Sequence, residues 1–573
     1  MSSSQLGQAQ RLEALARLRD ETFDVVVVGG GVTGAGAALD AATRGLSVAL
    51  LERRDLAAGT SSRSSKLIHG GLRYLEQRNF GLVREALKER SLLLQRLCPH
   101  LVHPVPFLLP LQAQWQRPYY GAGVLLYDTL GGARAVPHHR HLSRRAALRE
   151  APGLRADALV GAIQYYDAQV DDARHTLAVA RTAAGLGAAV ATGVEMVDLR
   201  RDGARVVGVE ARETTTGERF EVRGRTVVVA TGVWTDEAQQ LVGGSAELKV
   251  RASKGVHFLI PRARFRSDTG LILRTEKSVL FVIPWGSHWL IGTTDTDWTL
   301  DKTHPAATRR DIDYLLERVN AVFVDPIGRE DIEGVYAGLR PLVSAADTAS
   351  TAQLSREHSV VTPAPGLVVV AGGKYTTYRV MGEDAVDAAA RFLPGSVPAS
   401  ATEDTPLVGA DGYHARLNAR ARIAATHGLT VAQVDHLLGR YGGEVEEVLR
   451  TADDEPELLR PIEGAEEYLA VEARYAATHE AATHLEHVLA RRTHIAIETR
   501  DRGVEAAEAV ARLMAPALGW DEVTVRGEVD AYRAQVEAER LSQEQATDEA
   551  ANAVRLDVPD VGETDAAGAL STR

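Results

Sequence analysis

The 573-residue sequence contains one cysteine, Cys98, and therefore cannot form an intrachain disulfide. A single thiol also excludes a metal site built on a cluster of cysteines, and it suits a reducing compartment. No uninterrupted apolar run reaches the ~18 residues that a membrane-spanning helix requires, so any membrane contact is expected at the surface. Residues 1–20 lack the apolar core of a secretory signal. These absences predict a cytoplasmic protein.

The charge balance is acidic, with a formal net charge of −12, which argues against a general nucleic-acid-binding protein. Hydrophobic residues make up 45% and charged residues 25% of the chain, the usual balance of a globular protein. A chain of this length predicts two or three domains and can bury a large core.

The first strong pattern is one βαβ unit, with an apolar strand at residues 23–28, a helix at 32–44 and a second strand at 46–51. Residues from about 72 to 150 are typical of long helices and loops. Apolar runs that predict strands return at residues 226–230, 256–260, 279–284, 290–293 and 367–371. Strands this scattered predict two interleaved domains rather than two consecutive ones.

The composition changes near residue 400, after which alanine, glutamate, leucine and arginine dominate. We predict a separate helical domain over 400–541, with helices at 431–441, 466–476 and 485–492. Residues 542–573 carry seven acidic residues against two arginines and predict a disordered acidic tail. Residues 1–20 form an N-terminal arm in which Leu12, Leu15 and Leu18 indicate a short amphipathic helix.

A glycine cluster follows the first strand and opens the helix, with Gly29, Gly31 and Gly34 in the dinucleotide-binding spacing. Glycines let the backbone turn tightly and approach a pyrophosphate, which lies at the positive N-terminus of the helix. Glu52 ends the second strand, where a carboxylate accepts hydrogen bonds from a ribose and repels a 2′-phosphate. Strand, helix, second strand and glutamate in register together predict a dinucleotide site.

Three later segments favour FAD over a nicotinamide cofactor. A loop of hydroxyl and cationic side chains suits phosphate and ribityl oxygens, a small-residue turn follows the strand at 226–230, and a helix begins after the strand at 367–371. The backbone N–H groups of that second helix start can stabilise negative charge on reduced flavin. The predicted FAD ligands in these segments are Thr60, Ser61, Ser64, Ser65 and Lys66, then Thr231 and Gly232, then Gly373, Lys374 and Thr376.

Residues 60–75, together with 170–174, 281–285, 338–342 and 372–379, resemble the signature segments of FAD-dependent, respiratory-type glycerol-3-phosphate dehydrogenases. The similarity runs in order from about residue 23 to 541. The resemblance implies an α/β fold in which a two-dinucleotide-binding-type FAD domain over 21–399 is interleaved with an antiparallel-sheet substrate domain, mainly 72–165 and 245–340. An all-α C-terminal domain follows. Residues 472–475 and 491–493 also resemble family patterns, without an assigned chemical role.

A phosphorylated alcohol requires fixed cations, and arginine suits phosphate because its planar fork can donate two parallel hydrogen bonds. The candidate substrate ligands, which the resemblance places near the flavin, are Arg73, Arg340, Arg356 and Lys374, with Tyr74 as a further donor. Arg340 is set between Gly338-Leu339 and Pro341-Leu342, an apolar context in which an unpaired cation would be costly.

Oxidation of a secondary alcohol requires a base for the hydroxyl proton and an acceptor for the hydride on carbon 2. His257, in the strand at 256–260, is the first candidate base and matches a histidine that the family places in the substrate pocket. Lys374 is the competing base, if burial and nearby arginines lower its pKa. Arg340 would then stabilise the developing alkoxide. His69, followed by Gly70 in an Ile-His-Gly-Gly turn, is expected to pack against the flavin.

The resemblance also implies that electrons pass to a membrane quinone, from a peripheral position on the inner face of the cell membrane. Residues 118–127 are apolar and aromatic, which suits either an interfacial contact or ordinary core packing. Basic residues often surround this segment in the family, and here only Arg117 and Arg134 flank it. The helical domain has two open roles, docking of a partner protein or formation of a homodimer.

Three alternatives remain at the level of sequence. A glycerol-3-phosphate oxidase would use O2 instead of a quinone, and an amine or amino-acid oxidase of the same fold would use its arginine for a carboxylate. A flavin-binding subunit without turnover would hold FAD that substrate does not bleach.

Overall fold

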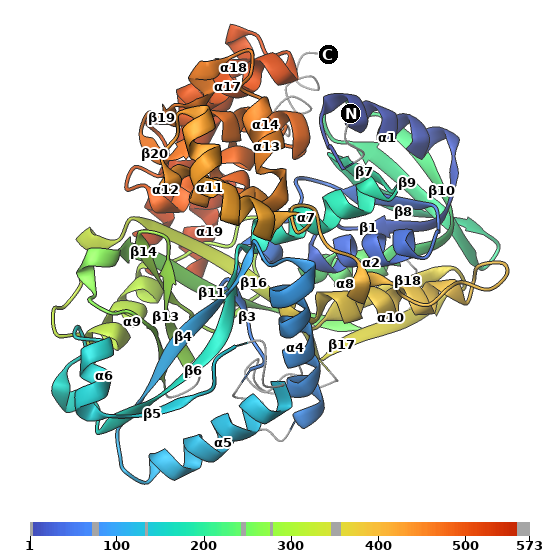
Figure 1. Ribbon diagram of the computed structural model, residues 1–573. Coiled ribbons are helices and arrows are strands. Elements are labelled where there is room, and N and C mark those ends of the chain that lie inside the picture. The colour runs from blue at the N-terminus through green and yellow to red at the C-terminus, as the bar shows by residue number, and fades with distance from the viewer. Residues whose placement is uncertain are drawn as a thin grey trace.

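The computed structural model describes residues 4–71, 79–131, 136–241, 248–275, 279–344 and 357–558. Two large sheets lie side by side and a helical domain covers the junction between them (Figure 1). The chain crosses between the two sheets several times, which confirms the interleaved arrangement. No helix in the described part of the chain is both long and apolar enough to cross a membrane.

The first sheet forms the FAD-binding half and has the strand order β17-β18-β10-β1-β2-β7. Neighbouring strands from β18 to β7 run parallel, and β17 is antiparallel at the edge. Parallel strands are covered on both faces, so their sequences are almost continuously apolar. The strands are β1 (Thr22–Val28), β2 (Val48–Glu52), β7 (Ala189–Thr192), β10 (Arg219–Val229), β17 (His358–Ala364) and β18 (Leu367–Gly372).

Helices cover one face of this sheet, and a β-hairpin with α1 covers the other (Figure 1). Val25 and Val27 of β1 point to the helices, whereas Val26 and Val28 point to the hairpin side. The elements are α2 (Val32–Thr43), α7 (Asp172–Gly185) and α10 (Tyr378–Ala390) on the first face, α1 (Gln8–Asp20), β8 (Val194–Asp202) and β9 (Arg205–Glu213) on the second, and α8 (Thr235–Gln240) after β10.

The predicted amphipathic helix of the N-terminal arm is α1. Leu15 and Leu18 are buried against the sheet, whereas Leu12 is 60% exposed. Just before the helix, Leu6 forms a bridge with Glu480 of the helical domain. The arm is therefore packed against both parts of the molecule.

The second sheet forms the substrate half and is antiparallel except where β12 lies parallel to β4. Its strands come from segments far apart in the sequence. They are β3 (Leu67–Ile68), β4 (Val102–Leu111), β5 (Arg140–Ser143), β6 (Gly161–Val170), β11 (Lys249–Pro261), β12 (Gly270–Arg274), β13 (Val279–Trp285), β14 (His288–Gly292), β15 (Thr296–Trp298) and β16 (Gly334–Ser344).

The expectation of only helices and loops over residues 72–150 was wrong, because the described part of this segment contains β4 and β5 as well as helices. Prolines at 104, 106 and 110 obscure β4 in the sequence, since proline cannot donate to a sheet ladder and is unusual within a strand. β4 nevertheless pairs with β6 along its whole length. The helices of this half are α4 (Phe80–Leu92), α5 (Gln116–Gly131), α6 (Arg144–Glu150) and α9 (Arg309–Asn320).

The C-terminal domain is a helical bundle with one short hairpin, so it is not entirely α-helical. The predicted helix at 466–476 was wrong at its start, because residues 465–469 form a strand. The elements are α11 (Tyr413–His427), α12 (Val431–Tyr441), α13 (Val445–Arg450), β19 (Pro461–Ile462), β20 (Ala465–Leu469), α14 (Ala470–His479), α15 (Leu485–His487), α16 (Ile495–Glu498), α17 (Ala507–Leu518) and α18 (Glu522–Gln543).

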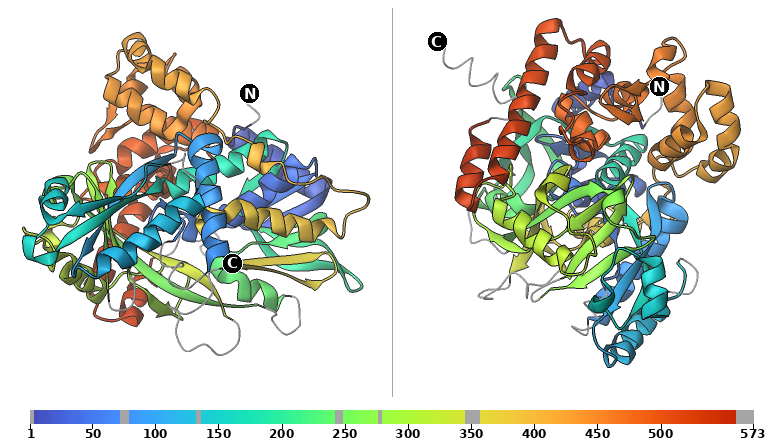
Figure 2. Two further views of the ribbon diagram at one scale, coloured as in Figure 1. Left: turned by 60° about the horizontal axis from the view of Figure 1, so that its bottom comes forward. Right: turned by 90° about the vertical axis from the view of Figure 1, so that its left-hand side faces the viewer.

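The predicted disordered tail was wrong for residues 542–558. Helix α19 (Asp548–Leu556) follows α18 and runs down beside the substrate half (Figure 2, right). Its first residue, Asp548, pairs with the buried ammonium of Lys254 on β11, which Asp311 also contacts at 2.7 Å. A buried cation needs carboxylate partners, and this pairing fixes the acidic segment in place. Residues 559–573 lie outside the described residues.

Candidate active site

The turn between β1 and α2 forms the expected phosphate cradle, and its geometry requires glycine. Gly29 has φ +112°, and a β-carbon there would lie 2.6 Å from the carbonyl oxygen of Ala230. A β-carbon at Gly34 would overlap the carbonyl oxygen of Gly29. Gly31 caps α2 without a side chain, so the positive end of the helix stays open to an anion.

Glu52 lies beside this turn and orders it. Its carboxylate accepts hydrogen bonds from the backbone N–H of Gly30 at 2.7 Å and of Arg54 at 2.8 Å. Burial raises the pKa of the Glu52 carboxyl, and the two backbone donors oppose that shift. Glu52 thus holds the glycine turn to the end of β2 through these two hydrogen bonds.

The hydroxyl-rich loop lies over the cradle and is held by neighbouring segments. Ser61, on the short 3-10 turn Thr60–Ser62, accepts a hydrogen bond at 2.9 Å from the N–H of Val32, the first residue of α2. The Thr60 hydroxyl donates to the carbonyl of Leu339 at 2.6 Å. The loop therefore contacts both the cradle and the substrate strand β16.

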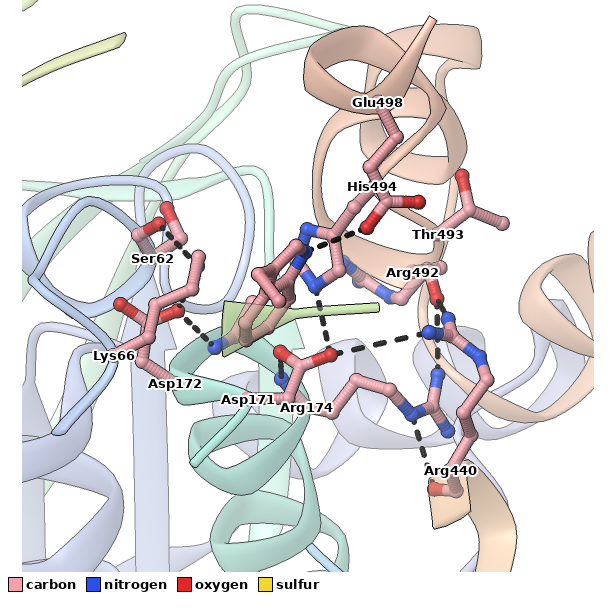
Figure 3. A network of polar contacts seen from close by, with 12 residues as sticks. Ser62, Lys66, Asp171, Asp172, Arg174, Arg440, Arg492, Thr493, His494 and Glu498 are labelled. Carbon is pink, nitrogen blue, oxygen red and sulfur yellow. Dashed lines mark hydrogen bonds and ion pairs between the residues drawn. The ribbon is translucent and has the colours of Figure 1, made fainter. Parts of the chain in front are cut away.

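Lys66 does not offer a free cation to the cofactor, contrary to the expectation from sequence. Its ammonium is buried and pairs with Asp172 at 2.5 Å (Figure 3). The other oxygen of Asp172 accepts hydrogen bonds from the Ser64 hydroxyl at 2.7 Å and from the Ser64 N–H at 3.0 Å. Ser64 and Lys66 therefore shape the loop, and they neutralise Asp172 rather than a phosphate.

Two further segments converge on the cradle. The Thr231 hydroxyl, after β10, is buried and has no hydrogen-bond partner among the described residues, and Gly232 beside it has φ +57°. Gly373 has φ +84° and precedes the 3-10 turn Tyr375–Thr377 that opens α10. An orphaned hydroxyl beside an open helix start fits a cofactor rich in hydrogen-bonding groups. The residues present therefore fit FAD.

The Ile-His-Gly-Gly turn is held by hydrogen bonds to neighbouring residues of the protein. The Thr376 hydroxyl is hydrogen-bonded to the backbone N–H and carbonyl of His69, at 3.2 Å each. The His69 ring packs edge-on to Phe281, with centroids 6.5 Å apart. The N–H of Gly70 donates to the Tyr127 hydroxyl at 2.8 Å. This N–H is therefore engaged within the protein, whereas a contact with the cofactor was expected from the sequence.

His257 lies on β11 with its imidazole buried. Its Nε2 is 2.9 Å from the Ser65 hydroxyl, and its ring stacks on Tyr336 with centroids 4.9 Å apart. Its Nδ1 is buried and has no hydrogen-bond partner within the described part of the chain. Burial, reinforced by the charges of Arg340 and Lys66, holds the pKa of His257 well below its ordinary value of 6.5. The ring is therefore neutral near pH 7, and the same burial weakens it as a base.

Two facing glycines create a trough between β11 and β16. The two strands pair antiparallel, and Gly255 lies opposite Gly338. Two residues along β11 from Gly255, His257 lies opposite Tyr336. In the other direction, Arg340 follows Gly338 by two residues on β16. Because side chains alternate along a strand, these residues share one face. The trough therefore has His257 at one end and Arg340 at the other, with no side chain of β11 or β16 between them. The Arg340 guanidinium and the Thr293 hydroxyl lie over Gly255, and Arg63 lies over Gly338.

Arg340 is oriented by the loop after β14. Its guanidinium donates to the Thr293 hydroxyl at 2.8 Å and to the Thr294 carbonyl at 3.3 Å, with Asp295 at 3.9 Å. A β-carbon at Gly255 would lie 2.5 Å from one guanidinium nitrogen, so glycine is needed for this position. The side chain remains 23% exposed, which leaves the guanidinium accessible to a ligand.

Of the other predicted substrate ligands, only Lys374 lies within the described residues. Lys374 caps the 3-10 turn before α10 and is half-buried. Arg73, Tyr74 and Arg356 lie outside the described residues. The trough and Lys374 are thus the described parts of the predicted substrate site.

The C-terminal domain holds the start of α7, which sequence reasoning did not foresee (Figure 3). Asp171 caps α7 by accepting from the N–H of Arg174 and pairs with His494 at 2.7 Å. The Arg174 guanidinium, in turn, pairs with Glu480 at 2.6 Å. The residue after Asp171, Asp172, pairs with Lys66 of the flavin loop. Two consecutive aspartates at the start of α7 therefore bind two segments: Asp171 binds the C-terminal domain, and Asp172 binds the flavin loop.

A second contact from the same domain holds the segment after Glu52. Asp55 is fully buried and pairs with Arg491 at 2.5 Å and with Arg492 at 2.6 Å. Burial opposes ionisation, yet the charges of Arg492 and Arg491 lower the pKa of Asp55 well below its usual range. The only sequence signals for these contacts were the aspartate pair at 171–172 and the arginine pair at 491–492, whose partners are hundreds of residues away.

Comparisons with known proteins agree with this architecture. Residues 24–388 match the family model "FAD dependent oxidoreductase", and residues 400–525 match "C-terminal domain of alpha-glycerophosphate oxidase". The chain is 58% identical to glycerol-3-phosphate dehydrogenase 2 of Mycobacterium tuberculosis, over 97% of this chain and 95% of that protein. It is 37% identical to the human mitochondrial glycerol-3-phosphate dehydrogenase, over 89% of this chain and 72% of that protein.

Among solved structures, the glycerol-3-phosphate dehydrogenase from Bacillus halodurans, complexed with FAD, aligns with a TM-score of 0.77 at 29% identity, over 94% of this chain and 98% of that chain. L-alpha-glycerophosphate oxidase from Mycoplasma pneumoniae shares the fold over 66% of this chain and 97% of that one, with a TM-score of 0.53 at 17% identity. With the cradle, the trough and the helical domain in place, the chain belongs to the family of FAD-dependent glycerol-3-phosphate dehydrogenases.

Proposed function

We propose that the protein oxidises sn-glycerol 3-phosphate to dihydroxyacetone phosphate, with transfer of the carbon-2 hydride to N5 of FAD and of the electrons to a membrane quinone. The observation that carries the proposal is the trough, which places a neutral imidazole and a partly exposed guanidinium on one face of the β11–β16 pair. The names of the relatives support the choice of substrate.

Each residue of the trough has a separate role in the proposed reaction. Arg340 binds and orients the substrate, because its planar fork can pair with phosphate or alkoxide oxygens. His257 accepts the hydroxyl proton, since its ring is neutral and one nitrogen is free of partners among the described residues. The Ser65 hydroxyl holds the other ring nitrogen and so fixes the plane of the imidazole. Bound FAD supplies the hydride acceptor.

Membrane docking is proposed for helix α5. Trp115 just before the helix, with Tyr119, Leu125 and Leu126 on it, is 38–65% exposed, whereas Val124 on the opposite side is fully buried. The two expectations for this segment, core packing and interfacial contact, thus correspond to two faces of one helix. Exposed aromatic and aliphatic side chains along one face suit shallow insertion into a lipid surface. This helix lies at the edge of the substrate half, away from the helical domain (Figure 1).

The test is anaerobic reduction of the purified holoenzyme by glycerol 3-phosphate, followed by absorbance of the flavin. Bleaching by this substrate and recolouring by a soluble quinone analogue is the expected result. Unchanged absorbance would rule out the enzyme, and bleaching by an amino acid instead would move it to another class. A second candidate, an oxidase, is favoured by the family model matched at 400–525. It predicts that O2 recolours the flavin as fast as the quinone does and releases peroxide.

A further inference from the structure

A cavity of about 430 Å³ lies between the FAD half and the C-terminal domain. Its walls are the segment from Arg53 to Arg63, the end of β7, the N-terminal turn of α1 and residues of the helical domain from Ala477 to Arg555. The cradle glycines, Glu52, Thr231 and Lys374 do not line it. The cavity therefore does not include the cradle glycines, although it borders the flavin loop and the trough through Arg63, which lies over Gly338.

The wall is strongly cationic, with seven arginines against three glutamates. Each glutamate is already engaged. Glu486 pairs with Arg491, and Glu539 lies 3.4 Å from Arg555. Glu528 accepts from the Leu485 N–H and contacts His484, both at 2.8 Å. The acidic groups of the wall are thus not available to the remaining arginines.

Arg63 is one of the remaining arginines. Among the described residues it has no ion pair within 4.0 Å, although Glu486 and Glu539 of the same wall act on it at longer range. Burial, reinforced by the neighbouring charges of Arg54 and Arg491, lowers the pKa of Arg63 to about 10. Arg63 is half-buried, so its guanidinium faces the cavity without a carboxylate in direct contact.

Arg502, from the helical domain, faces the same cavity. It is buried, and its guanidinium donates only to neutral acceptors, the carbonyl of Val335 at 3.2 Å and the amide oxygen of Gln543 at 3.4 Å. Its backbone has φ +67°, a strained conformation for a residue with a side chain, and the Tyr532 hydroxyl holds its carbonyl at 2.6 Å. The fold therefore stabilises an unfavourable backbone to keep this guanidinium in the wall.

We infer that this interdomain cavity is a binding site for a small phosphate-bearing anion, distinct from the substrate. Arg63 and Arg502 supply planar, charge-assisted donors that suit phosphate oxygens. Leu518, Trp520 and Val536 line the same cavity and would cover the less polar part of the ligand. Because Arg63 belongs to the flavin loop and Arg502 to the C-terminal domain, the ligand bridges the two halves and stabilises their contact.

The test uses inorganic pyrophosphate as the probe and isothermal titration calorimetry on FAD-loaded protein. The protein carries Arg340→Ala, which removes the phosphate position of the catalytic trough. We expect saturable one-to-one binding that weakens by about tenfold or more with Arg63→Gln or Arg502→Gln, since each removes a charged hydrogen bond. Arg512→Gln, an exposed arginine of the same domain, is the matched control and leaves the affinity unchanged.

Thermal unfolding of the same samples gives an independent measurement. Pyrophosphate raises the unfolding temperature of the Arg340→Ala protein, and Arg63→Gln abolishes the rise without loss of bound flavin. No saturable binding in the Arg340→Ala background would overturn the inference, as would an affinity in both the Arg63→Gln and the Arg502→Gln proteins equal to that of the Arg340→Ala background. Failure of either kind is distinct from failure of the proposed activity, because neither readout involves turnover.

Discussion

The Ser65 hydroxyl lies 2.9 Å from Nε2 of His257 and joins the flavin loop directly to the substrate sheet. The loop reaches this position because Asp172 holds its neighbours Ser64 and Lys66. One hydrogen bond thus relates the cofactor side of the site to the proposed base.

Replacement of His257 by alanine should lower turnover by about 10²–10⁴-fold, because it removes the proton acceptor. Ser65→Ala should cost less, about tenfold, because the base stays but its ring is no longer held. Anaerobic stopped-flow reduction of the flavin measures both rates directly. A His257→Ala protein within a fewfold of wild type would transfer the role of base to Lys374.

Arg340→Ala should raise the KM for glycerol 3-phosphate by a hundredfold or more, since about 2–5 kcal/mol is lost when one partner of a desolvated charged pair is removed. FAD should remain bound, because the cradle does not involve this residue. Steady-state kinetics and flavin content decide the outcome. Arg251→Ala is the control, since Arg251 lies on β11 and makes an exposed pair with Asp297. Normal kinetics in Arg340→Ala would exclude its proposed role.

The trough itself can be tested with Gly255→Ala. The added methyl would lie 2.5 Å from the Arg340 guanidinium and displace it, so kcat/KM should fall by about a hundredfold. Circular dichroism and flavin content should stay normal. Gly527→Ala adds a methyl in open space on α18 and should have no effect on either quantity. Equal activity of the two variants would contradict the geometry of the trough.

Asp55→Asn tests whether the ion pairs between Asp55 and the C-terminal domain stabilise the contact of that domain with the FAD half. Loss of this carboxylate leaves Arg491 and Arg492 without their shared partner and should lower the unfolding free energy by about 3–5 kcal/mol. Urea denaturation followed by flavin fluorescence measures the change, with earlier flavin release expected. Asp157→Asn, in an exposed pair with Arg155, is the comparison and should be neutral. Comparable stability of the two variants would contradict a stabilising role for the Asp55 ion pairs.

Buried histidines predict an acid-sensitive fold. Burial lowers the pKa values of His100, His175 and His487 from 6.5 to about 3, so the unfolded state binds more protons once the pH drops below 6.5. Stability is present above that pH and falls by about 1.4 kcal/mol per pH unit for each histidine between about pH 6 and pH 4. Urea titrations across this range measure the slope. His100→Phe should reduce it, whereas His414→Phe, at an exposed position, should not.

Fold class and cofactor could be read from the sequence because their signals are local. The strand, glycine turn and Glu52 lie within about thirty residues, and each requires a particular backbone or charge. His257 and Arg340 could be proposed singly, but their shared face depends on the pairing of Gly255 with Gly338. The pairing of the Lys66 ammonium could not be predicted, because its partner Asp172 lies 106 positions away. Long-range ion pairs of this kind leave no periodic trace in a sequence.

The strand order also bears on how the chain is made. In the FAD sheet, β10 lies between β1, near residue 25, and β18, near residue 370. During synthesis the parallel sheet therefore stays open at β10 until about two thirds of the chain has left the ribosome. Lys254 can pair with Asp311 earlier, but its second carboxylate, Asp548, comes from the last helix. The emerging polypeptide thus carries an unpaired strand edge at β10 until β18 is made, and such edges favour association with other chains.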